Sequence, residues 1–474
     1  MDEWAKSWLM EQRKMGKKGL EIKYISNHHY VYHSTTHWDK QLKKRIKDSD
    51  YIGKLDRTKG LIEGVKRSVT AKNLRGIKEY GNAMLFDRIL TDMRSCLEDA
   101  FKDDWEEIYA LAITRASGYM PLKRVHSAWD KIYNVQKINP NLDAKNLSHV
   151  LKAVGIDSHA QDSVFRALSK KDKDLVYDLS TVLTKSSINF AEFGYNKNKI
   201  HIPQINIALF CSLDTGLPTM IRTIPGSVRD IKSLYNSIVE ANKEGSTIIL
   251  DRGFFSKDAI KFLLEKKMSF ILPARRNSLL YGTDIDLNNH LFYQDRLIKC
   301  GKEKKDGIFL YLYEDQQLML EENITLYQKL DEGKIDANKL SEAQKRAGKI
   351  LIVSNLDLDE NTIFMQYKSR DRIEKLFDTY KNALQADILY LQDNESVFGH
   401  IFISFLSLYA YTKIEMALKK VDLLRKQSPK DILLDLSKVY LVELNDCNII
   451  SEIPRKLETL DAKLGFNLFP KYRS

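Results

Sequence analysis

Four side chains that can bind metal ions or phosphates lie at helical spacing near residue 370. Tyr367, Arg370, Glu374 and Lys381 are separated by three, four and seven positions. At about 100° per residue, they fall within an arc of roughly 60° on a single helix, which we predict over residues 366–381. An apolar stripe beside them predicts the face that packs on a core, and it consists of Ile373, Phe377, Tyr380 and Leu384. Taken alone, the polar stripe is also typical of a solvated helix face with an Arg–Glu pair.

Two aspartates occupy positions in predicted strands that seldom carry charge. Asp178 interrupts the apolar run LVYDLSTVL, and Asp251 directly follows the buried run TIIL. In open α/β sheets, ligands bind beyond the carboxyl ends of strands, which is where Asp251 lies. The alternatives are a solvent-facing acid on an edge strand for Asp178 and a turn before Gly253 for Asp251. Asp214 and Asp230 are weaker candidates, because a turn and a helix cap already account for them.

The three carboxylates form a metal site if the fold brings them together. Like charges repel, so convergence of Asp178, Asp251 and Glu374 predicts bridging cations, and Mg²⁺ prefers such oxygen ligands. Two ions about 3.5–4 Å apart can activate the attacking oxygen and stabilise the leaving oxygen of a phosphodiester displacement. The remaining residues of the polar stripe then supply donors to the DNA phosphates: Tyr367, Arg370 and Lys381.

A mixed sheet covered by helices is predicted to position these residues. Strands are predicted at 174–183 and 204–224, followed by a helix at 226–242 with Ser227 as its cap. The runs STIIL, SKDAIKFLLEKK and MSFILPA then form a β-α-β unit, which implies parallel strands. We therefore assign residues 171–275 to the first part of an α/β core.

The rest of the core follows an interruption. Residues 276–349 do not continue the alternation of strands and helices. They contain short strand-like runs and a charged stretch, and we predict a β-rich insertion. Residues 350–420 resume the sheet and contain the Glu374 helix and a second helix that is apolar on nearly all sides. Residues 421–474 are predicted to be a small C-terminal appendage.

The N-terminal sixth carries most of the net positive charge. Residues 1–80 contain 19 Lys and Arg against 10 Asp and Glu, whereas the whole chain of 474 residues has a net charge of +11. Polar and aromatic residues alternate in residues 20–56, which predicts a small antiparallel sheet with a basic turn. We predict that residues 1–80 bind DNA, and that residues 81–170 form a helical module. The histidines at 28, 29, 33 and 37 are interpreted as exposed sheet residues rather than metal ligands.

Composition argues against several classes of protein. Four widely separated cysteines show no zinc-ligand spacing and no disulfide framework, and they suit a reducing cytoplasm. The longest apolar run, near residues 397–411, is too short for a membrane span and is broken by His400. The N-terminus MDEWAKSWLM is too acidic for a signal peptide. We expect a cytoplasmic, nucleoid-associated protein without a membrane partner.

The sequence resembles the DDE transposases of the insertion-sequence-four type. Their signature is Tyr, two residues, Arg, three residues, Glu, six residues, Lys, and the polar stripe matches every spacing. LVYDLSTVL and ILDRGFFS resemble the two Asp motifs of this family, and FGYNKNKIHIPQINIALF and GHIFISFLSLYAY resemble its flanking segments. The resemblance covers about residues 100–470. Asp371 stands where the family often has Trp.

This resemblance implies a fold and an activity. The fold is a ribonuclease-H-like mixed-sheet core of the α/β class, interrupted by a β-rich insertion before the Glu-bearing helix. The separation of 123 positions between Asp251 and Glu374 agrees with such an insertion. Asp178, Asp251 and Glu374 become the catalytic and metal-binding residues for two Mg²⁺ ions, with Mn²⁺ able to substitute. A homodimer on DNA would bind terminal inverted repeats of double-stranded DNA, cleave there and join the ends to target DNA.

Three alternatives remain open on the sequence. The first is a catalytically inactive, transposase-derived DNA-binding regulator, because the basic N-terminus would serve it equally well. The second is a scaffold protein, for which the polar stripe is a solvated face and DNA affinity is absent. The third is a nuclease that cleaves without strand transfer.

Overall fold

The computed structural model divides into two compact units, Met1–Arg75 with Leu444–Cys447, and Gly76–Glu443 with Asn448–Ser474. It describes residues 2–470 apart from 26, 40–43, 64–72, 119, 171, 173, 185, 187, 195–201, 228–234, 236, 239–244, 388 and 446. The predicted helix at 226–242 lies largely outside the described residues. Of the basic turn predicted at 39–47, residues 40–43 also lie outside them, and residues 44–47 belong to a strand instead. The middle of the run FGYNKNKIHIPQINIALF lies outside the described residues as well.

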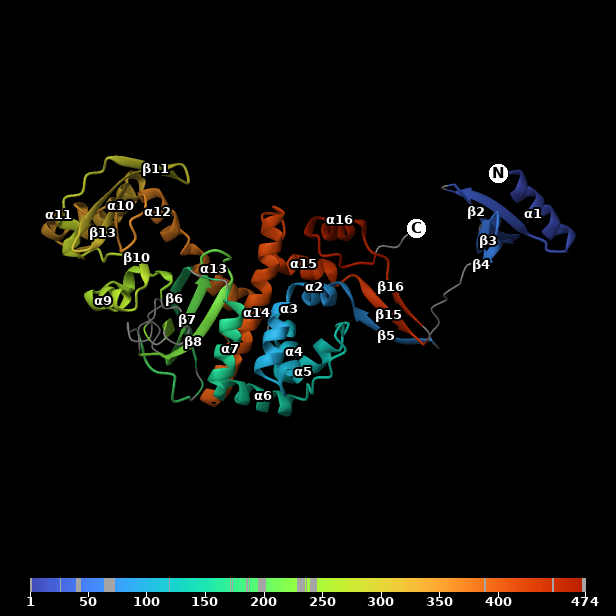
Figure 1. The fold of residues 1–474 in the computed structure, drawn as a ribbon, viewed down its shortest axis with the longest axis horizontal. Coiled ribbons are helices and arrows are strands. Elements are labelled where there is room, and N and C mark those ends of the chain that lie inside the picture. Colours follow the sequence, from blue (N-terminus) through green and yellow to red (C-terminus); the bar gives the residue numbers. More distant parts are fainter. Residues whose placement is uncertain are drawn as a thin grey trace. The chain divides into compact units, whose positions relative to one another are not determined.

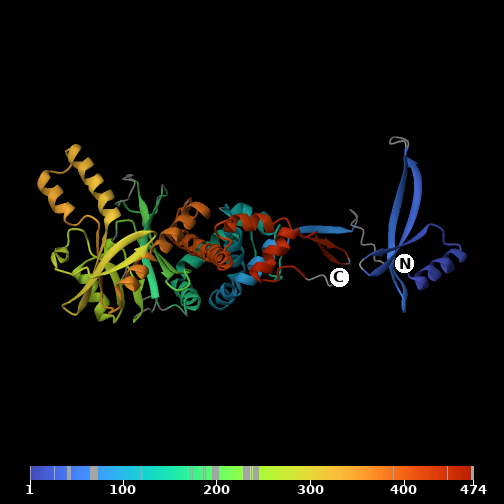
Figure 2. The ribbon, with the colours of Figure 1, turned by 90° about the horizontal axis from the view of Figure 1, so that it is seen from above.

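The N-terminal unit is a four-stranded antiparallel sheet with one helix against it (Figure 1). Apolar residues of the helix, including Ala5 and Leu9, form a small core with Leu20, Val31 and Leu55 of the sheet. Two of the strands form a long hairpin, which is clear in Figure 2. The elements are α1 (Glu3–Lys14), β1 (Leu20–Ile25), β2 (His28–Asp39), β3 (Lys44–Asp56) and β4 (Gly60–Glu63).

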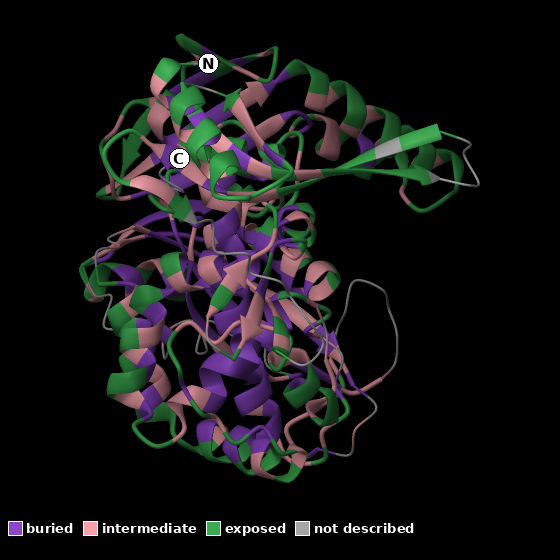
Figure 3. Ribbon diagram, turned by 90° about the vertical axis from the view of Figure 1, so that its right-hand side faces the viewer, coloured by how far each residue is buried: buried purple, intermediate pink, exposed green. Residues whose placement is uncertain are grey.

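Six helices lie in the segment predicted to be helical. Several of them pack around α14 (Asn394–Lys420), whose residues are mostly buried, and buried residues gather in this unit in Figure 3. By length and composition alone α14 could cross a membrane, but 78% of its most apolar window is buried inside the protein. The six helices are α2 (Gly81–Ile89), α3 (Thr91–Ala100), α4 (Trp105–Ala116), α5 (Leu122–Trp129), α6 (Ala144–Ile156) and α7 (Ser158–Leu168).

A buried polar contact explains why His400 interrupts the apolar α14. Arg115 of α4 donates to the Ser404 hydroxyl at 2.7 Å and lies 3.2 Å from His400 Nδ1. The other ring nitrogen, Nε2, is 3.0 Å from the Ala386 carbonyl. Burial and the neighbouring Arg115 lower the pKa of His400 to about 3, so the ring is neutral at physiological pH. The two helices are therefore joined by hydrogen bonds inside their apolar contact.

One mixed sheet of nine strands forms the centre of the second unit. The first three of its strands in chain order, β6, β7 and β8, pair antiparallel. Strand β9 then pairs parallel with both β6 and β10. Helix α9 (Lys257–Glu265) joins β9 to β10, which confirms the predicted β-α-β unit. In spatial order the strands are β11 (Asn289–Tyr293), β12 (Arg296–Lys305), β13 (Ile308–Asp315), β14 (Lys349–Ser354), β10 (Ser269–Pro273), β9 (Thr247–Ile249), β6 (Asp174–Leu183), β7 (Gln204–Ser212) and β8 (Pro218–Pro225).

The inserted residues 276–349 extend this sheet. Strand β14 lies antiparallel between β10 and β13, and the hairpins of β11, β12 and β13 continue outward from it. The charged stretch forms two helices, α10 (Gln316–Asp331) and α11 (Ala337–Gln344). Backbone pairing therefore joins the insertion to the core sheet through β14 and β10, and β10 in turn pairs with β9, which precedes Asp251.

The single helix predicted over residues 366–381 is wrong. The chain forms α12 (Glu360–Lys368) and α13 (Asp371–Asp378), followed by a π-helical turn at Thr379–Ala383 (Figure 1). At the break, Ile373 N–H bonds to the Arg370 carbonyl at 3.0 Å, a three-residue step that tightens the chain. The Ser369 hydroxyl also donates to the Gln366 carbonyl at 2.5 Å and competes with the helix ladder. The predicted apolar stripe is confirmed, because all four of its residues are buried.

A small C-terminal sheet completes the fold. Strand β15 lies between β16 and β5. Helix α15 begins with a capping box, in which the side chains of Ser428 and Asp431 bond to each other's backbone N–H groups. These elements are β5 (Leu74–Glu79), α15 (Pro429–Leu436), β15 (Tyr440–Leu444), β16 (Asn448–Ile450) and α16 (Arg455–Leu464).

Candidate active site

Asp178 and Asp251 come from neighbouring parallel strands. The register pairs Leu175 with Ile248 and Val176 with Ile249. Asp178 and Asp251 each lie two residues beyond the last pair, and residues two apart on a strand share a face. The two carboxylates therefore lie side by side on one face, at the carboxyl end of β9. This is the position that the strand pattern and the rule for open α/β sheets predicted for Asp251.

Helix α13 positions Glu374. The helix packs on β6 and β7 through a buried apolar face that includes Ile373, Leu376 and Phe377. Arg372 donates to the main-chain oxygen of Leu213, which follows β7. Glu374 lies on the exposed side of the helix, at its first turn. The core packing of α13 therefore fixes where this carboxylate enters the site.

The guanidinium of Arg370 contacts all three acids. Its Nη1 donates to Asp251 Oδ1 at 2.9 Å, and its Nη2 donates to Glu374 Oε1 at 2.7 Å. Nη1 is also 4.0 Å from Asp178 Oδ2. The break between α12 and α13 places Arg370 at this point. The structure thus brings together three acids that are remote in the chain, around one positive charge.

The three acids differ in their environment. The side chain of Asp178 is 19% exposed, whereas those of Asp251 and Glu374 are 39% and 55% exposed. Burial, together with the charges of Asp251 and Glu374, raises the pKa of Asp178 to about 6, although the hydrogen bond from Leu179 N–H and the charge of Arg370 oppose the rise. Asp178 is the buried end of the cluster, and the other two carboxylates reach solvent.

The raised pKa of Asp178 predicts an effect of pH on stability. An acid whose pKa is higher in the folded state destabilises that state as pH rises from about 4 through about 6. We expect Asp178→Asn to raise the apparent Tm of the metal-free protein at pH 7.5. At pH 4 most of the gain should disappear, because Asp178 is then protonated in the folded wild type and about half protonated in the unfolded chain. Differential scanning calorimetry in EDTA at both pH values measures this, and a loss of stability at pH 7.5 would contradict it.

Tyr367 and Lys381 flank the acids. Tyr367 lies in the last turn of α12, where burial raises its pKa; the charges of Arg370 and Arg252 lower this pKa and that of Asp251 raises it. The ammonium of Lys381 lies in the π-helical turn and donates to the Thr181 carbonyl at 2.7 Å. Thr181 belongs to β6, three residues beyond Asp178. Tyr367 is therefore within electrostatic reach of the acid cluster, and Lys381 lies further along the strand that carries Asp178.

Asp371, the departure from the family signature, lies apart from the cluster. It is exposed in the first turn of α13, where a negative charge suits the helix dipole. A carboxylate at this position therefore stabilises α13 while Glu374 enters the site one turn further on.

The chemistry of the acids fits a divalent cation. When all are ionised, three carboxylates face one guanidinium, so the cluster keeps a net charge of about −2. All of their atoms are hard oxygen donors of the kind that Mg²⁺ prefers. Among the described residues, no group of three His, Cys, Asp or Glu is close enough to hold a metal ion as it stands. Arg370 stands between the acids, so its side chain must move before they can share an ion.

Sequence reasoning missed two arginines at the site. Arg275 donates to the Gly253 carbonyl at 2.9 Å and thereby holds the turn that follows Asp251. Nε of Arg252 is buried, and among the described residues it has no hydrogen-bond partner. Both residues follow parallel strands of the core, β10 and β9. The rule that placed Asp251 at a strand's carboxyl end would have found them.

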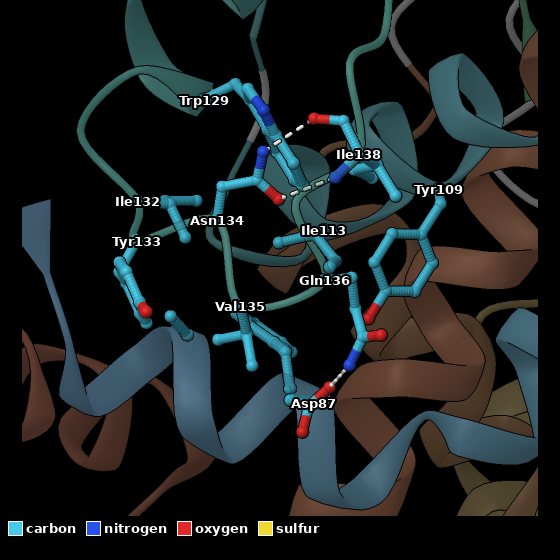
Figure 4. Close-up of a pocket in the computed structure, with 12 residues that line it drawn as sticks. Asp87, Tyr109, Ile113, Trp129, Ile132, Tyr133, Asn134, Val135, Gln136 and Ile138 are labelled. Carbon is cyan, nitrogen blue, oxygen red and sulfur yellow. Dashed lines mark hydrogen bonds between the residues drawn. The ribbon is translucent and has the colours of Figure 1, made fainter.

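A separate cavity lies in the helical part of the second unit (Figure 4). Its volume is about 20 Å³, enough for a single water molecule. Asn134 bonds to Ile138 in both directions across its rim, at 2.6 and 3.1 Å, and Gln136 donates to Asp87. With only one acid in its lining and so little room, this cavity is not the catalytic site.

Comparison with known proteins agrees with the class of site that the geometry defines, an acid cluster on a mixed α/β sheet. The family model described as "Transposase DDE domain" matches residues 169–410, which include the three acids and the three residues predicted to donate to phosphates. The chain belongs to this family of transposases. No curated protein matches the chain.

Among solved structures, the chain is similar to a piggyBac transposase in a synaptic complex with hairpin DNA, determined by cryo-EM. The two chains are 15% identical with a TM-score of 0.41, and the match covers 76% of this chain and 79% of the other.

Proposed function

We propose that this DDE transposase cleaves DNA at the ends of an insertion sequence and joins those ends to target DNA. The observation that carries the proposal is the meeting of Asp178, Asp251 and Glu374 around one cationic group. The mixed sheet, with its acid-bearing strands adjacent and parallel, supports a ribonuclease-H-like core. Membership of the transposase family supplies the biological context for such a site.

In this proposal the three acids hold two Mg²⁺ ions, and Mn²⁺ can substitute. When bound, the ions activate the attacking oxygen and stabilise the leaving oxygen of the phosphodiester. Arg370 gives up its contacts with Asp251 and Glu374 and donates to a DNA phosphate, for which its planar fork is suited. Tyr367 and Lys381, on either side, donate to the same backbone. The apolar face of α13 keeps these groups in place.

The other parts of the proposal concern DNA recognition. The basic residues 1–80 bind double-stranded DNA, including the terminal inverted repeats, through their excess of Lys and Arg. Two copies pair the element ends as a homodimer, and the protein works in the cytoplasm in association with the nucleoid. The position of Arg370 among the acids favours one rival function, a regulator that binds DNA without cutting it. In that protein Arg370 stays hydrogen-bonded to Asp251 and Glu374.

Cleavage of the native element ends tests this proposal. The substrate is duplex DNA that carries the inverted repeats flanking the coding region in its native DNA. We expect nicks at the repeat ends in Mg²⁺, none in EDTA, and joining of the new 3′ ends to a target plasmid. DNA that is shifted on a gel but remains uncut would instead establish the regulator. Cutting without joining would establish a nuclease.

A further inference from the structure

The outer face of the N-terminal sheet alternates aromatic and cationic side chains. The core residues Leu20, Val31 and Leu55 point toward α1, so their strand neighbours point away from it. Register pairs on that outer face join Lys23 with Tyr30, Tyr30 with Lys54, Tyr32 with Tyr51 and Trp38 with Arg45. We call this surface the tyrosine face, and it comprises Lys23, Tyr30, Tyr32, Trp38, Arg45, Tyr51 and Lys54.

Aromatic contacts hold the tyrosine face together. The ring of Tyr51 lies 6.0 Å from that of Tyr30 and 5.5 Å from that of Tyr32, and the interplanar angles are 59° and 60°. The rings are therefore tilted against one another and not stacked. The Lys23 ammonium lies 4.4 Å from the centre of the Tyr32 ring. This contact places a positive charge next to an aromatic face.

The face continues along the hairpin to an exposed tryptophan. Trp38 is 58% exposed, and its register partner Arg45 is also exposed. Trp38 is eight positions beyond Tyr30 on the strand, which corresponds to about 27 Å. Two described acids alternate onto this face: Glu21, whose charge is matched by Lys47 at 2.7 Å, and Asp56, which accepts hydrogen bonds from Thr58 and Lys59 in the turn after β3.

We propose that the tyrosine face binds single-stranded DNA by stacking unpaired bases on its aromatic rings. Proteins that bind single strands combine a basic groove with aromatic residues on which successive bases stack. A four-stranded sheet with helix on one face and aromatic residues on the other is a known platform for two or three bases. Duplex DNA does not offer such stacking, because its base faces are already covered within the helix. The occupant is therefore a strand with unpaired bases, and the flanking lysines and Arg45 contact its phosphates.

This site is distinct in its chemistry from the acid cluster, and it goes beyond the proposed cleavage. The full chain in EDTA, which prevents cutting, is titrated against a fluorescent oligothymidylate of about 20 nucleotides and a mixed-sequence duplex of the same length. We expect Trp38→Ala and Tyr51→Ala each to weaken oligothymidylate binding by about 5- to 100-fold. Duplex affinity should change by less than about threefold, because its contacts are mainly to phosphates.

Two controls separate stacking from general damage. Tyr24→Ala removes a ring as large as that of Tyr51. Tyr24 is 52% exposed and belongs to the same sheet, but it pairs with His29 and points to the side of the sheet that faces α1. It should leave oligothymidylate affinity unchanged. Tyr51→Phe keeps the ring and should bind nearly as tightly as the wild type. Trp38 lies outside the small core, so Trp38→Ala remains informative even if Tyr51→Ala fails to fold.

Several results would overturn the proposal. One is unchanged oligothymidylate affinity in Trp38→Ala and in a folded Tyr51→Ala. Another is an equal loss for single-stranded and duplex DNA, which would make the face a general phosphate contact. A lower mass of the variants in sedimentation would make it a contact between copies of the chain, and much tighter binding of oligouridylate would point to RNA. None of these results depends on whether the acid cluster cleaves DNA.

Discussion

Glu374→Gln is expected to lower Mg²⁺-dependent cleavage of element-end DNA by on the order of 1,000-fold or more, equal to about 4 kcal/mol of barrier. The substitution removes one negative charge from the cluster while keeping the size of the side chain. The amide oxygen of Gln can still accept the Arg370 hydrogen bond that Glu374 accepts at 2.7 Å. The fold of α13 should therefore survive, and binding to the same DNA should change by less than about threefold.

Asp378→Asn is the matched control for this experiment. Asp378 is also an exposed acid on α13, one turn beyond Glu374, and it contacts Asn382 instead of the cluster. Its substitution should leave the cleavage rate within about twofold. Cleavage at the wild-type rate by Glu374→Gln would refute the role of this carboxylate, whereas loss of DNA binding in parallel would assign it to DNA contact.

Arg370→Gln is expected to destabilise the metal-free protein by about 1–3 kcal/mol. Without Arg370, the three acids are left with no positive charge among them, and removing one partner of a buried ion pair costs about 3–5 kcal/mol. We discount that figure because Asp251 and Glu374 are 39% and 55% exposed and therefore screened. Thermal unfolding in EDTA measures the loss. Addition of Mg²⁺ should then raise the Tm of Arg370→Gln more than that of the wild type, because in the variant no guanidinium competes with Mg²⁺ for the three carboxylates.

The conservative variant makes this result interpretable. Arg370→Lys keeps the positive charge and should retain most of the stability in EDTA, although a single ammonium cannot form the same fork. If Arg370→Gln gained no more from Mg²⁺ than the wild type does, the cation would bind elsewhere. The view of Arg370 as a resident counter-ion of the acids would then be wrong.

Local patterns predicted several parts of this site. The three-and-four spacing of Ile373, Phe377 and Tyr380 identified the buried face of α13 and of the π-helical turn after it, because core packing imposes that spacing. The β-α-β pattern after residue 246 placed Asp251 at a strand end, and its parallel pairing with β6 brings Asp178 alongside. In each case the information lies within a few residues of the chain.

Other parts depend on contacts between distant segments. At the break at Ser369 and Arg370 the chain makes three-residue hydrogen bonds, and the Arg370 guanidinium donates to Asp251, 119 positions away. The spacing of apolar residues over about ten positions carries no information about these hydrogen bonds or about the contact with Asp251. Likewise, the pairing of β14 with β10 and β13 joins the insertion to the core through backbone bonds that carry no residue-specific signal.

A crystal structure of the full chain soaked in Mn²⁺, with anomalous difference maps, tests the central claim most directly. Manganese replaces magnesium at oxygen sites and its position is visible without any assay of activity. We predict anomalous peaks in contact with the carboxylates of Asp178, Asp251 and Glu374, with the Arg370 guanidinium moved away from them. Manganese bound elsewhere, with Arg370 still hydrogen-bonded to Asp251 and Glu374 at saturating metal, would contradict the account.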